Sequence, residues 1–141
     1  MGARLGYYWA RKKGGAMDVA NLDEKMASRK RKIDLFGTDN FRCWMLNFVP
    51  GDGTDMHFHA NPETFLVLSG NGVIKGLNGE ERAIKKNEIV FLAAKDYYQL
   101  TNTGTEPLVL LGNRSEAFGG PHILADGRDR NKQRANPSAG S

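Results

Sequence analysis

The stretch Gly51-Asp-Gly-Thr-Asp-Met-His57-Phe-His59-Ala-Asn-Pro-Glu63 decides how this chain is interpreted. It places two histidines one residue apart and a glutamate four residues after the second one. In an extended strand the side chains at i and i+2 point to the same face, so His57 and His59 project together. Pro62 disfavours helix in the residue before it and predicts a short turn, after which Glu63 opens the next strand. Two imidazoles and a carboxylate form a suitable ligand set for a divalent first-row metal ion.

The frame around these three residues is also regular. Its fixed positions read Gly51-x5-His57-x-His59-x3-Glu63-x6-Gly70. This pattern matches, position for position, the first motif of the cupin superfamily, and the chain resembles cupins over roughly residues 33–114. The resemblance implies a single double-stranded β-helix, a jelly-roll barrel, with the metal ion inside the barrel and His57, His59 and Glu63 as its ligands.

The rest of the chain predicts strands without reference to any family. Short apolar runs alternate with turns rich in Gly, Asn and Asp, which is typical of an all-β sandwich or barrel. The dipeptide Asn78-Gly79 carries the strongest hairpin signal, because it suits a tight turn with positive φ. The expected strands lie within residues 33–36, 41–49, 56–59, 63–70, 72–77, 81–85, 88–93, 97–102 and 107–114.

The length of 141 residues predicts one domain of ordinary size. Residues 1–17 form a basic extension that we expect to be flexible, and residues 18–125 form a single barrel domain with its core at 33–114. Within that domain, residues 18–32 are a short helix or a loose arm, and Phe118 with its neighbours is a candidate to fold back over the barrel. Residues 126–141 are polar with almost no apolar anchor, so we expect a disordered tail.

The charge distribution and the composition of the chain limit the classes of binding partner that we expect. The formal net charge of +4 arises in residues 1–17, which hold four basic side chains and no acidic one, so no basic face is expected on the barrel. We therefore expect no nucleic-acid partner. No stretch approaches the roughly 18 apolar residues of a membrane span, so no membrane partner is expected either. The single cysteine, Cys43, cannot form an intrachain disulfide; we expect it to be a packing residue in a reducing, cytoplasmic protein.

The second motif of the cupin family, G-x5-P-x-G-x2-H-x3-N, is mostly lost in this chain. Anchored on Asn102, it falls on Asn87-x5-Ala93-x-Lys95-x2-Tyr98-x3-Asn102, where only the asparagine is retained. The two glycine positions are occupied by Asn87 and Lys95. Tyr98 stands where the resemblance implies the last metal-binding histidine.

Three roles for Tyr98 follow from its position. As a tyrosinate it would bind the metal ion directly; as a neutral phenol it would contact substrate or transfer a proton; otherwise it packs in the barrel. The lost glycines also leave the register of the preceding turn open. A shift by one residue would bring Tyr97 or Gln99 to the inward position, because one step flips every side chain of a strand.

Alternation along the strands predicts the lining of the cavity. Phe65 and Val67 share a face with Glu63, and Leu100 and Asn102 share a face with Tyr98. In the run 41–49 one face holds Cys43, Met45 and Asn47 and the other holds Trp44, Leu46 and Phe48, and the pattern does not decide which one faces inward.

This lining predicts a mainly apolar cavity without a clear pair of cationic side chains. The only candidates are Arg42 and Lys75, of undetermined direction. We therefore expect a small apolar or aromatic substrate in place of a phosphosugar or nucleotide sugar. His122 either closes the pocket or lies on the surface, and the surface is the favoured interpretation.

Together these features predict a metal-dependent cupin enzyme of the dioxygenase type, with Fe(II) favoured over Mn, Ni or Zn and Tyr98 as the catalytic residue. The alternatives are an isomerase or lyase that uses the metal ion as a Lewis acid, and a non-catalytic cupin that binds a ligand. The resemblance further implies a homodimer, for which the outward Leu66 and Leu68 offer apolar surface.

Overall fold

The computed structural model describes residues 17–135 of the chain. Within them it forms ten short strands and two short helices. In chain order the elements are α1 (Leu22–Ala27), β1 (Lys32–Thr38), β2 (Phe41–Phe48), β3 (His57–Phe58), β4 (Glu63–Ser69), β5 (Asn71–Lys75), β6 (Glu81–Lys85), β7 (Ile89–Leu92), β8 (Gln99–Thr101), β9 (Leu108–Arg114), β10 (Ile123–Leu124) and α2 (Arg130–Ala135).

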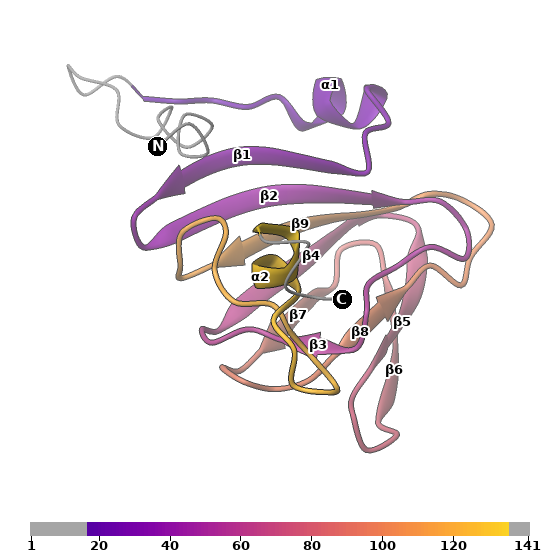
Figure 1. The fold of residues 1–141 in the computed structure, drawn as a ribbon. Helices are drawn as coiled ribbons and strands as arrows, with labels where there is room; N and C mark the ends of the chain where they lie inside the picture. The colour runs from indigo at the N-terminus through magenta and orange to yellow at the C-terminus, as the bar shows by residue number, and fades with distance from the viewer. Residues whose placement is uncertain (1–16, 136–141) are drawn as a thin grey trace.

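Two antiparallel sheets form the layers of the fold (Figure 1). One has five strands in the order β1-β2-β9-β4-β7, and the other has three in the order β6-β5-β8. Isolated bridges from Gly53 to Thr101 and from His57 to Tyr98 continue the second layer from β8 to β3, which pairs with β10. Each of the nine predicted runs overlaps a strand, so the all-β prediction is confirmed.

The apolar core lies between the two layers. The undecided face of β2 is resolved, because Trp44, Leu46 and Phe48 point into the core cluster. On β9 the glycine at 112 is required, since a Cβ there would lie 2.7 Å from the ring of Trp44 and 2.9 Å from that of Phe65. Those two rings meet edge to face with centroids 5.6 Å apart. Cys43 is buried in the sheet, as expected of a packing residue.

The hairpins follow the turn chemistry of the sequence. β5 and β6 pair around Asn78-Gly79, with φ +89° at Gly79. Gly70, a fixed position of the first motif, has φ +80°, and a Cβ there would lie 2.2 Å from the carbonyl oxygen of Pro107. Both conformations favour glycine because it carries no Cβ.

The second-motif turn keeps its backbone although its glycines are lost. Asn87 and Lys95 have φ of +71° and +67°, the left-handed region that glycine would normally occupy. The register is therefore preserved: Tyr98 is buried and Tyr97 is not. Asn102 holds this segment in place, since its side-chain amide donates to the carbonyl oxygens of Phe48 and Glu106, each at 2.8 Å.

The structure corrects one expectation at the C-terminal end. Residues 126–135, predicted to be part of a disordered tail, contain a turn and helix α2, and the chain before them returns to the barrel to pair with β3 (Figure 1). Polar contacts hold this segment: Asp129 accepts hydrogen bonds from the backbone N–H groups of His122 and Asn131. The prediction considered only apolar burial and so missed this polar docking. Phe118 is buried in the core, as its fold-back position requires.

At the other end, α1 confirms the short helix expected within 18–32; Asn21 caps it by accepting from the N–H of Glu24 at 3.0 Å. Residues 1–16 and 136–141, with most of the predicted flexible extension, lie outside the described part of the chain. Among the described residues no helix is long and apolar enough to cross a membrane.

Candidate metal centre

Strand β3 carries the two histidines of the first motif into the barrel. His57 begins β3 and exchanges two backbone hydrogen bonds with Tyr98, at 3.0 and 2.8 Å. His59 follows the strand, and its carbonyl oxygen accepts from the N–H of Lys95 at 2.8 Å. Both imidazoles are buried, and their centroids lie 4.8 Å apart. The predicted convergence of the two side chains is present.

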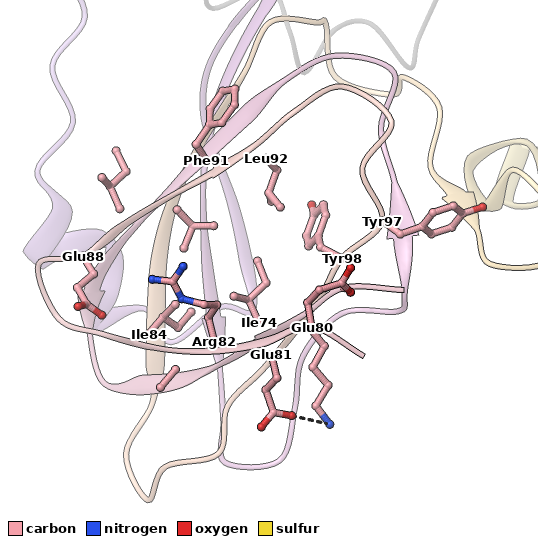
Figure 2. Close-up of a pocket in the computed structure, with 15 residues that line it drawn as sticks. Ile74, Glu80, Glu81, Arg82, Ile84, Glu88, Phe91, Leu92, Tyr97 and Tyr98 are labelled. Atoms are coloured by element: carbon pink, nitrogen blue, oxygen red, sulfur yellow. Dashed lines mark ion pairs between the residues drawn. The ribbon is translucent and has the colours of Figure 1, made fainter. Parts of the chain in front are cut away.

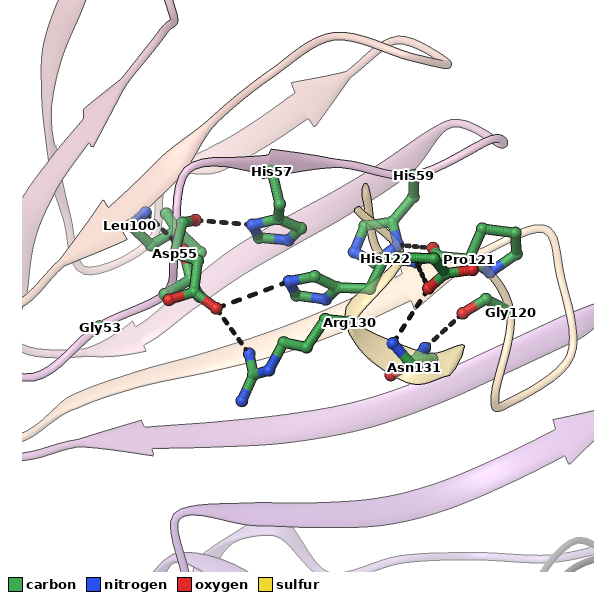
Figure 3. A network of polar contacts seen from close by, with 12 residues as sticks. Gly53, Asp55, His57, His59, Leu100, Gly120, Pro121, His122, Arg130 and Asn131 are labelled. Carbon is green, nitrogen blue, oxygen red and sulfur yellow. Dashed lines mark hydrogen bonds and ion pairs between the residues drawn. The ribbon is translucent and has the colours of Figure 1, made fainter. Parts of the chain in front are cut away.

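A backbone carbonyl fixes the tautomer of each ring (Figure 3). The Nδ1 of His57 lies 2.6 Å from the carbonyl oxygen of Asp55, and the Nδ1 of His59 lies 2.7 Å from that of Pro121. A carbonyl oxygen only accepts hydrogen bonds, so both Nδ1 atoms carry the proton. The Nε2 atoms then hold the lone pairs, which is the arrangement that orients histidines for metal binding.

The environment also keeps the two rings neutral. Burial, with a smaller contribution from the charge of Arg114, lowers the pKa of His59 to about 2. Burial likewise lowers the pKa of His57 to about 4. Metal ligation requires unprotonated imidazole, so both side chains are in the binding form at neutral pH without further change.

His122 completes a cluster of three histidines. Its ring stacks on that of His57 with centroids 3.9 Å apart and planes 4° apart, and its centroid lies 5.1 Å from that of His59. Donor atoms of the three residues lie within 4.8 Å of one another, near the roughly 4.2 Å that two metal–nitrogen bonds of about 2.1 Å can bridge. The chain has three histidines, so all of them meet here.

The favoured surface position of His122 is therefore wrong, and its pocket-closing alternative is correct. Its side chain is only 14% exposed, and its Nε2 lies 3.9 Å from a carboxylate oxygen of Asp55. The same carboxylate accepts from Arg130 at 2.9 Å (Figure 3). The pairing of β10 with β3 and the order of the C-terminal segment place His122 here, and both were absent from the sequence prediction.

Glu63 lies on the inward face of β4 and is buried, but its carboxylate is engaged elsewhere. One oxygen accepts from the phenol of Tyr98 and the other from Nε of Arg114. Cross-strand register explains the second contact, because Arg114 on β9 is directly opposite Glu63. Burial raises the pKa of Glu63 above its usual value, and the charge of Arg114 opposes that shift.

Tyr98 faces inward beside the histidines. Its ring centroid lies 4.5 Å from that of His57. Burial, followed by the nearby charge of Glu63, raises the pKa of the Tyr98 phenol well above 10. This shift favours a neutral phenol over a tyrosinate ligand, so the group is a proton donor that is already directed at Glu63. Its neighbour Tyr97 points the other way and donates to the carbonyl oxygen of Leu124 at 3.3 Å.

The prediction of a cavity without paired cationic side chains is wrong. Arg42 and Arg114 are both buried, and they are directly opposite each other on β2 and β9. The alternation of side chains along the strands contained this signal. Arg42 lies on the same face of β2 as the inward Trp44, and Arg114 lies on the same face of β9 as the inward Leu110. The guanidinium of Arg42 stacks on the ring of Trp44, and that of Arg114 forms an ion pair with Glu63. These contacts offset part of the free-energy cost of burying the two charges.

A cavity of about 130 Å³ lies at the mouth of the barrel beside these groups. Its wall combines the three histidines and Tyr98 with the rings of Trp44 and Phe65. The alternation rule is confirmed for the buried residues Phe65, Val67, Leu100 and Asn102. The cavity can accommodate only a small molecule while the C-terminal segment is docked.

A larger hollow of about 530 Å³ lies between β6 and β7, and Tyr98 lines it as well (Figure 2). Ile74, Ile84 and Leu92 form its apolar floor. Its charged residues, such as Glu81 and Arg82, are exposed to solvent, and none of the histidines lines it. The groups suited to metal chemistry therefore belong to the smaller cavity.

Comparison with known proteins agrees with this geometry. The family model described as "Cupin domain" matches residues 44–112. Auxin-binding protein 1 of Arabidopsis thaliana is 32% identical over 85 residues, which cover 55% of this chain and 43% of that protein. The chain thus spans less than half the length of the curated relatives that it matches.

Solved structures share the fold at lower identity. BH2720 from Bacillus halodurans superimposes with a TM-score of 0.67 at 18% identity, covering 85% of this chain and 92% of that one. A Klebsiella pneumoniae protein described as having a double-stranded beta-helix domain gives a TM-score of 0.65 at 20% identity, with coverages of 74% and 95%. The predicted double-stranded β-helix is confirmed.

Proposed function

Because this chain belongs to the cupin superfamily, we propose that it binds a divalent first-row metal ion through His57, His59 and His122 and holds a small organic molecule beside it. The observation that supports this proposal is the cluster itself: three histidines meet, and backbone carbonyls hold two of them with Nε2 available. A bound ion would supply Lewis acidity and open coordination positions for a ligand.

The identity of the third ligand decides which metal ion is favoured. With Glu63, the set of two histidines and one carboxylate favours Fe(II), as the sequence suggested. Glu63 would first have to leave Tyr98 or Arg114, and a buried arginine without its partner is costly. We therefore propose His122 as the third ligand, and an all-imidazole set suits Zn(II) and Ni(II) as well as Fe(II).

Two levels of function are compatible with such a site. Ligand binding is supported by the relatives at about 30% identity, which are named for binding auxin. A reaction is supported by Tyr98, whose phenol is hydrogen-bonded to Glu63 next to His57. Such a pair can hold or move a proton at the cavity wall, as an isomerase or lyase requires. A dioxygenase-like reaction would rely on the open metal positions instead.

Metal titration of untagged protein tests the proposed site. The three imidazoles give three ¹⁵N side-chain signal sets in NMR, and we expect all three to shift together on addition of one equivalent of Zn(II). His57→Ala, His59→Ala and His122→Ala should each weaken metal binding by roughly 100-fold or more. Glu63→Gln should have a much smaller effect.

The opposite ranking would identify Glu63 as the third ligand and His122 as a bystander. Asn61→Ala serves as a matched control, because Asn61 lies close in sequence and its side chain donates to the carbonyl oxygen of Ser115, outside the histidine cluster. If no imidazole signal responds to any of Fe(II), Mn(II), Ni(II) or Zn(II), the proposed function fails.

Turnover assays separate the two levels of function. Protein loaded anaerobically with Fe(II) would be exposed to oxygen with catechols, hydroxybenzoates and diketones, and oxygen uptake would be recorded. Uptake that disappears in His57→Ala supports the dioxygenase proposal. Saturable ligand binding without turnover under any metal supports a binding protein.

Self-association is a separate proposal. On β7 the side chains of Ile89 and Phe91 are 66% and 68% exposed and lie on the outer face of the five-stranded sheet, to which Leu66 also belongs. We propose that a second copy of the chain covers this face in a homodimer. Sedimentation velocity of Phe91→Glu against wild type tests it, and a dimer that persists in the variant would contradict it.

A further inference from the structure

We propose that Arg42 forms a binding subsite in the barrel cavity for the carboxylate of a small organic acid. The inference rests on the proposed function for the place of the ligand, and it adds the chemical class of that ligand. It replaces the apolar substrate expected from the sequence with an acid that has an apolar or aromatic body.

The first observation is the state of the Arg42 guanidinium. Arg42 is only 6% exposed and lines the cavity, yet its buried Nε has no hydrogen-bond partner among the described residues. A buried N–H of a charged group without an acceptor is costly, so such atoms normally have a partner. A ligand carboxylate would supply the acceptor.

The second observation is the balance of charge around the cavity. Its wall contains five cationic side chains, and four of them form ion pairs with carboxylates. The pairs are Arg31 with Asp52, Lys32 with Asp34, Arg114 with both Glu63 and Glu116, and Arg130 with Asp55. Arg42 is the fifth, and within residues 17–135 it forms no ion pair within 4.0 Å. Arg42 therefore has no carboxylate in direct contact, although Asp34, Glu63 and Glu116 act on its charge from a longer distance. The position beside its guanidinium suits the single carboxylate of a monoanion.

The third observation is how rigidly this charge is held. The guanidinium carbon of Arg42 lies 4.0 Å from the ring centroid of Trp44 and 4.2 Å from that of Phe118, so two aromatic rings lie against the guanidinium. Such stacking leaves the N–H edge as the surface for recognition, and that edge matches a planar carboxylate in a two-pronged contact. Burial and the charge of Arg114 also lower the pKa of Arg42 to about 10, with Asp34, Glu63 and Glu116 opposing the shift; an anion in direct contact would further stabilise the charged form.

The shape of the cavity limits the rest of the ligand. Its volume is about 130 Å³, and its apolar wall includes Trp44, Phe48 and Phe65. A single aromatic ring or a short aliphatic chain fits such a space. A doubly charged phosphate ester would leave one negative charge unmatched in a largely desolvated site.

Binding of benzoate, with benzamide as its neutral isostere, tests the proposal. Calorimetry is performed on the untagged full chain, both with metal ion and after treatment with a chelator. We expect benzoate to bind more tightly than benzamide, by roughly 10- to 100-fold, in both preparations. Equal affinity for the two compounds would overturn the proposal, and this comparison needs no variant.

The variant Arg42→Met then locates the effect. It should lose the preference for benzoate, while Arg31→Met, which removes a paired cation from the same wall, should keep most of it. Arg42→Lys retains the charge without the two-pronged edge and should fall between them. Circular dichroism checks that each variant is folded.

The outcomes also separate this proposal from the proposed function. Benzoate binding that survives metal removal but is lost in Arg42→Met supports the subsite even if no metal ion binds. Benzoate binding that is lost on metal removal and unchanged in Arg42→Met means that the metal ion holds the carboxylate; the subsite is then wrong while the metal centre stands.

Discussion

Residues 51–70 preserve the side chains of their cupin motif, whereas residues 87–102 preserve mainly the backbone conformation of theirs. The first segment keeps the side chains of its motif: His57 and His59 point inward, Glu63 is buried on the same side, and Gly70 adopts the left-handed backbone. The second segment keeps only Asn102 among its motif residues. Its backbone nevertheless takes left-handed φ at the two positions where the motif has glycine.

The difference teaches that backbone shape and site chemistry are separable in this barrel. The turn before Tyr98 is held by hydrogen bonds to its surroundings, such as that from Lys95 N–H to the carbonyl oxygen of His59, so it survives without glycine. The ligand set does not survive in the same way. Tyr98 binds Glu63, Arg114 neutralises Glu63, and His122 joins the two remaining histidines from outside both motifs.

The largest effect is expected from the removal of Glu63, which tests whether this residue of the first segment has a structural role. If its main partner is Arg114 and not a metal ion, Glu63→Ala removes the closest carboxylate of a buried guanidinium and leaves it only Glu116 at 3.3 Å, so we expect the free energy of unfolding to fall by about 3–5 kcal/mol. Urea unfolding of metal-free protein measures this loss. Glu81→Ala is the control, because its pair with Lys75 is exposed and is worth less than about 1 kcal/mol. A loss below 1 kcal/mol for Glu63→Ala would contradict the structural role.

The histidines of the first segment predict a pH dependence of metal-free protein. His57 has a pKa of about 4 when folded, below its ordinary value of 6.5, so the unfolded chain binds more protons between these values. Its contribution to stability is complete above pH 6.5 and is lost as the pH falls, at about 1.4 kcal/mol per pH unit, or roughly 3 kcal/mol by pH 4.

Chemical denaturation in the presence of a chelator from pH 7.5 to 4.5 measures that slope. The variant His57→Gln should flatten it by about 1.4 kcal/mol per pH unit. Identical slopes for variant and wild type would show that the imidazole of His57 is not kept neutral by burial.

In the second segment, Tyr98→Phe tests whether the tyrosine supports Glu63 or binds a metal ion. It removes the phenol that donates to the buried Glu63, so we expect a loss of about 2 kcal/mol in unfolding free energy with little change in metal affinity. Tyr97→Phe, whose hydroxyl contacts Leu124 near the surface, should lose less than about 1 kcal/mol. A large fall in metal affinity for Tyr98→Phe would instead make the tyrosine a ligand.

The fold was predictable because its signals are local. Alternation and turn residues mark every strand from β1 to β9, and Asn78-Gly79 marks its hairpin. The convergence of His57 and His59 was predictable for the same reason, since the period of a strand fixes it. The inward face of β2 followed only once its pairing with β9 was known.

The remainder of the site depends on contacts between distant parts of the chain. The shortage of apolar residues predicts a disordered tail, yet Arg130 and Asp129 dock it through polar contacts, and this places His122. The partner of Glu63 depends on the register of β4 against β9, which the residue pattern does not contain. The inward direction of Arg42 and Arg114 became clear only from the structure, which places them opposite each other on β2 and β9 with both side chains buried.

The smallest predicted effect tests whether the second segment is less stable because Asn87 and Lys95 replace the two glycines of the motif. Lys95 has φ +67°, where a Cβ is unfavourable, so Lys95→Gly should stabilise the protein by about 0.5–1 kcal/mol. Asn87→Gly should gain less, because asparagine tolerates this conformation better. Lys86→Gly is the control: its φ is negative, so added flexibility should destabilise it slightly. If Lys95→Gly also destabilises, the lysine must make compensating contacts, and the backbone of this turn would then depend on its side chains after all.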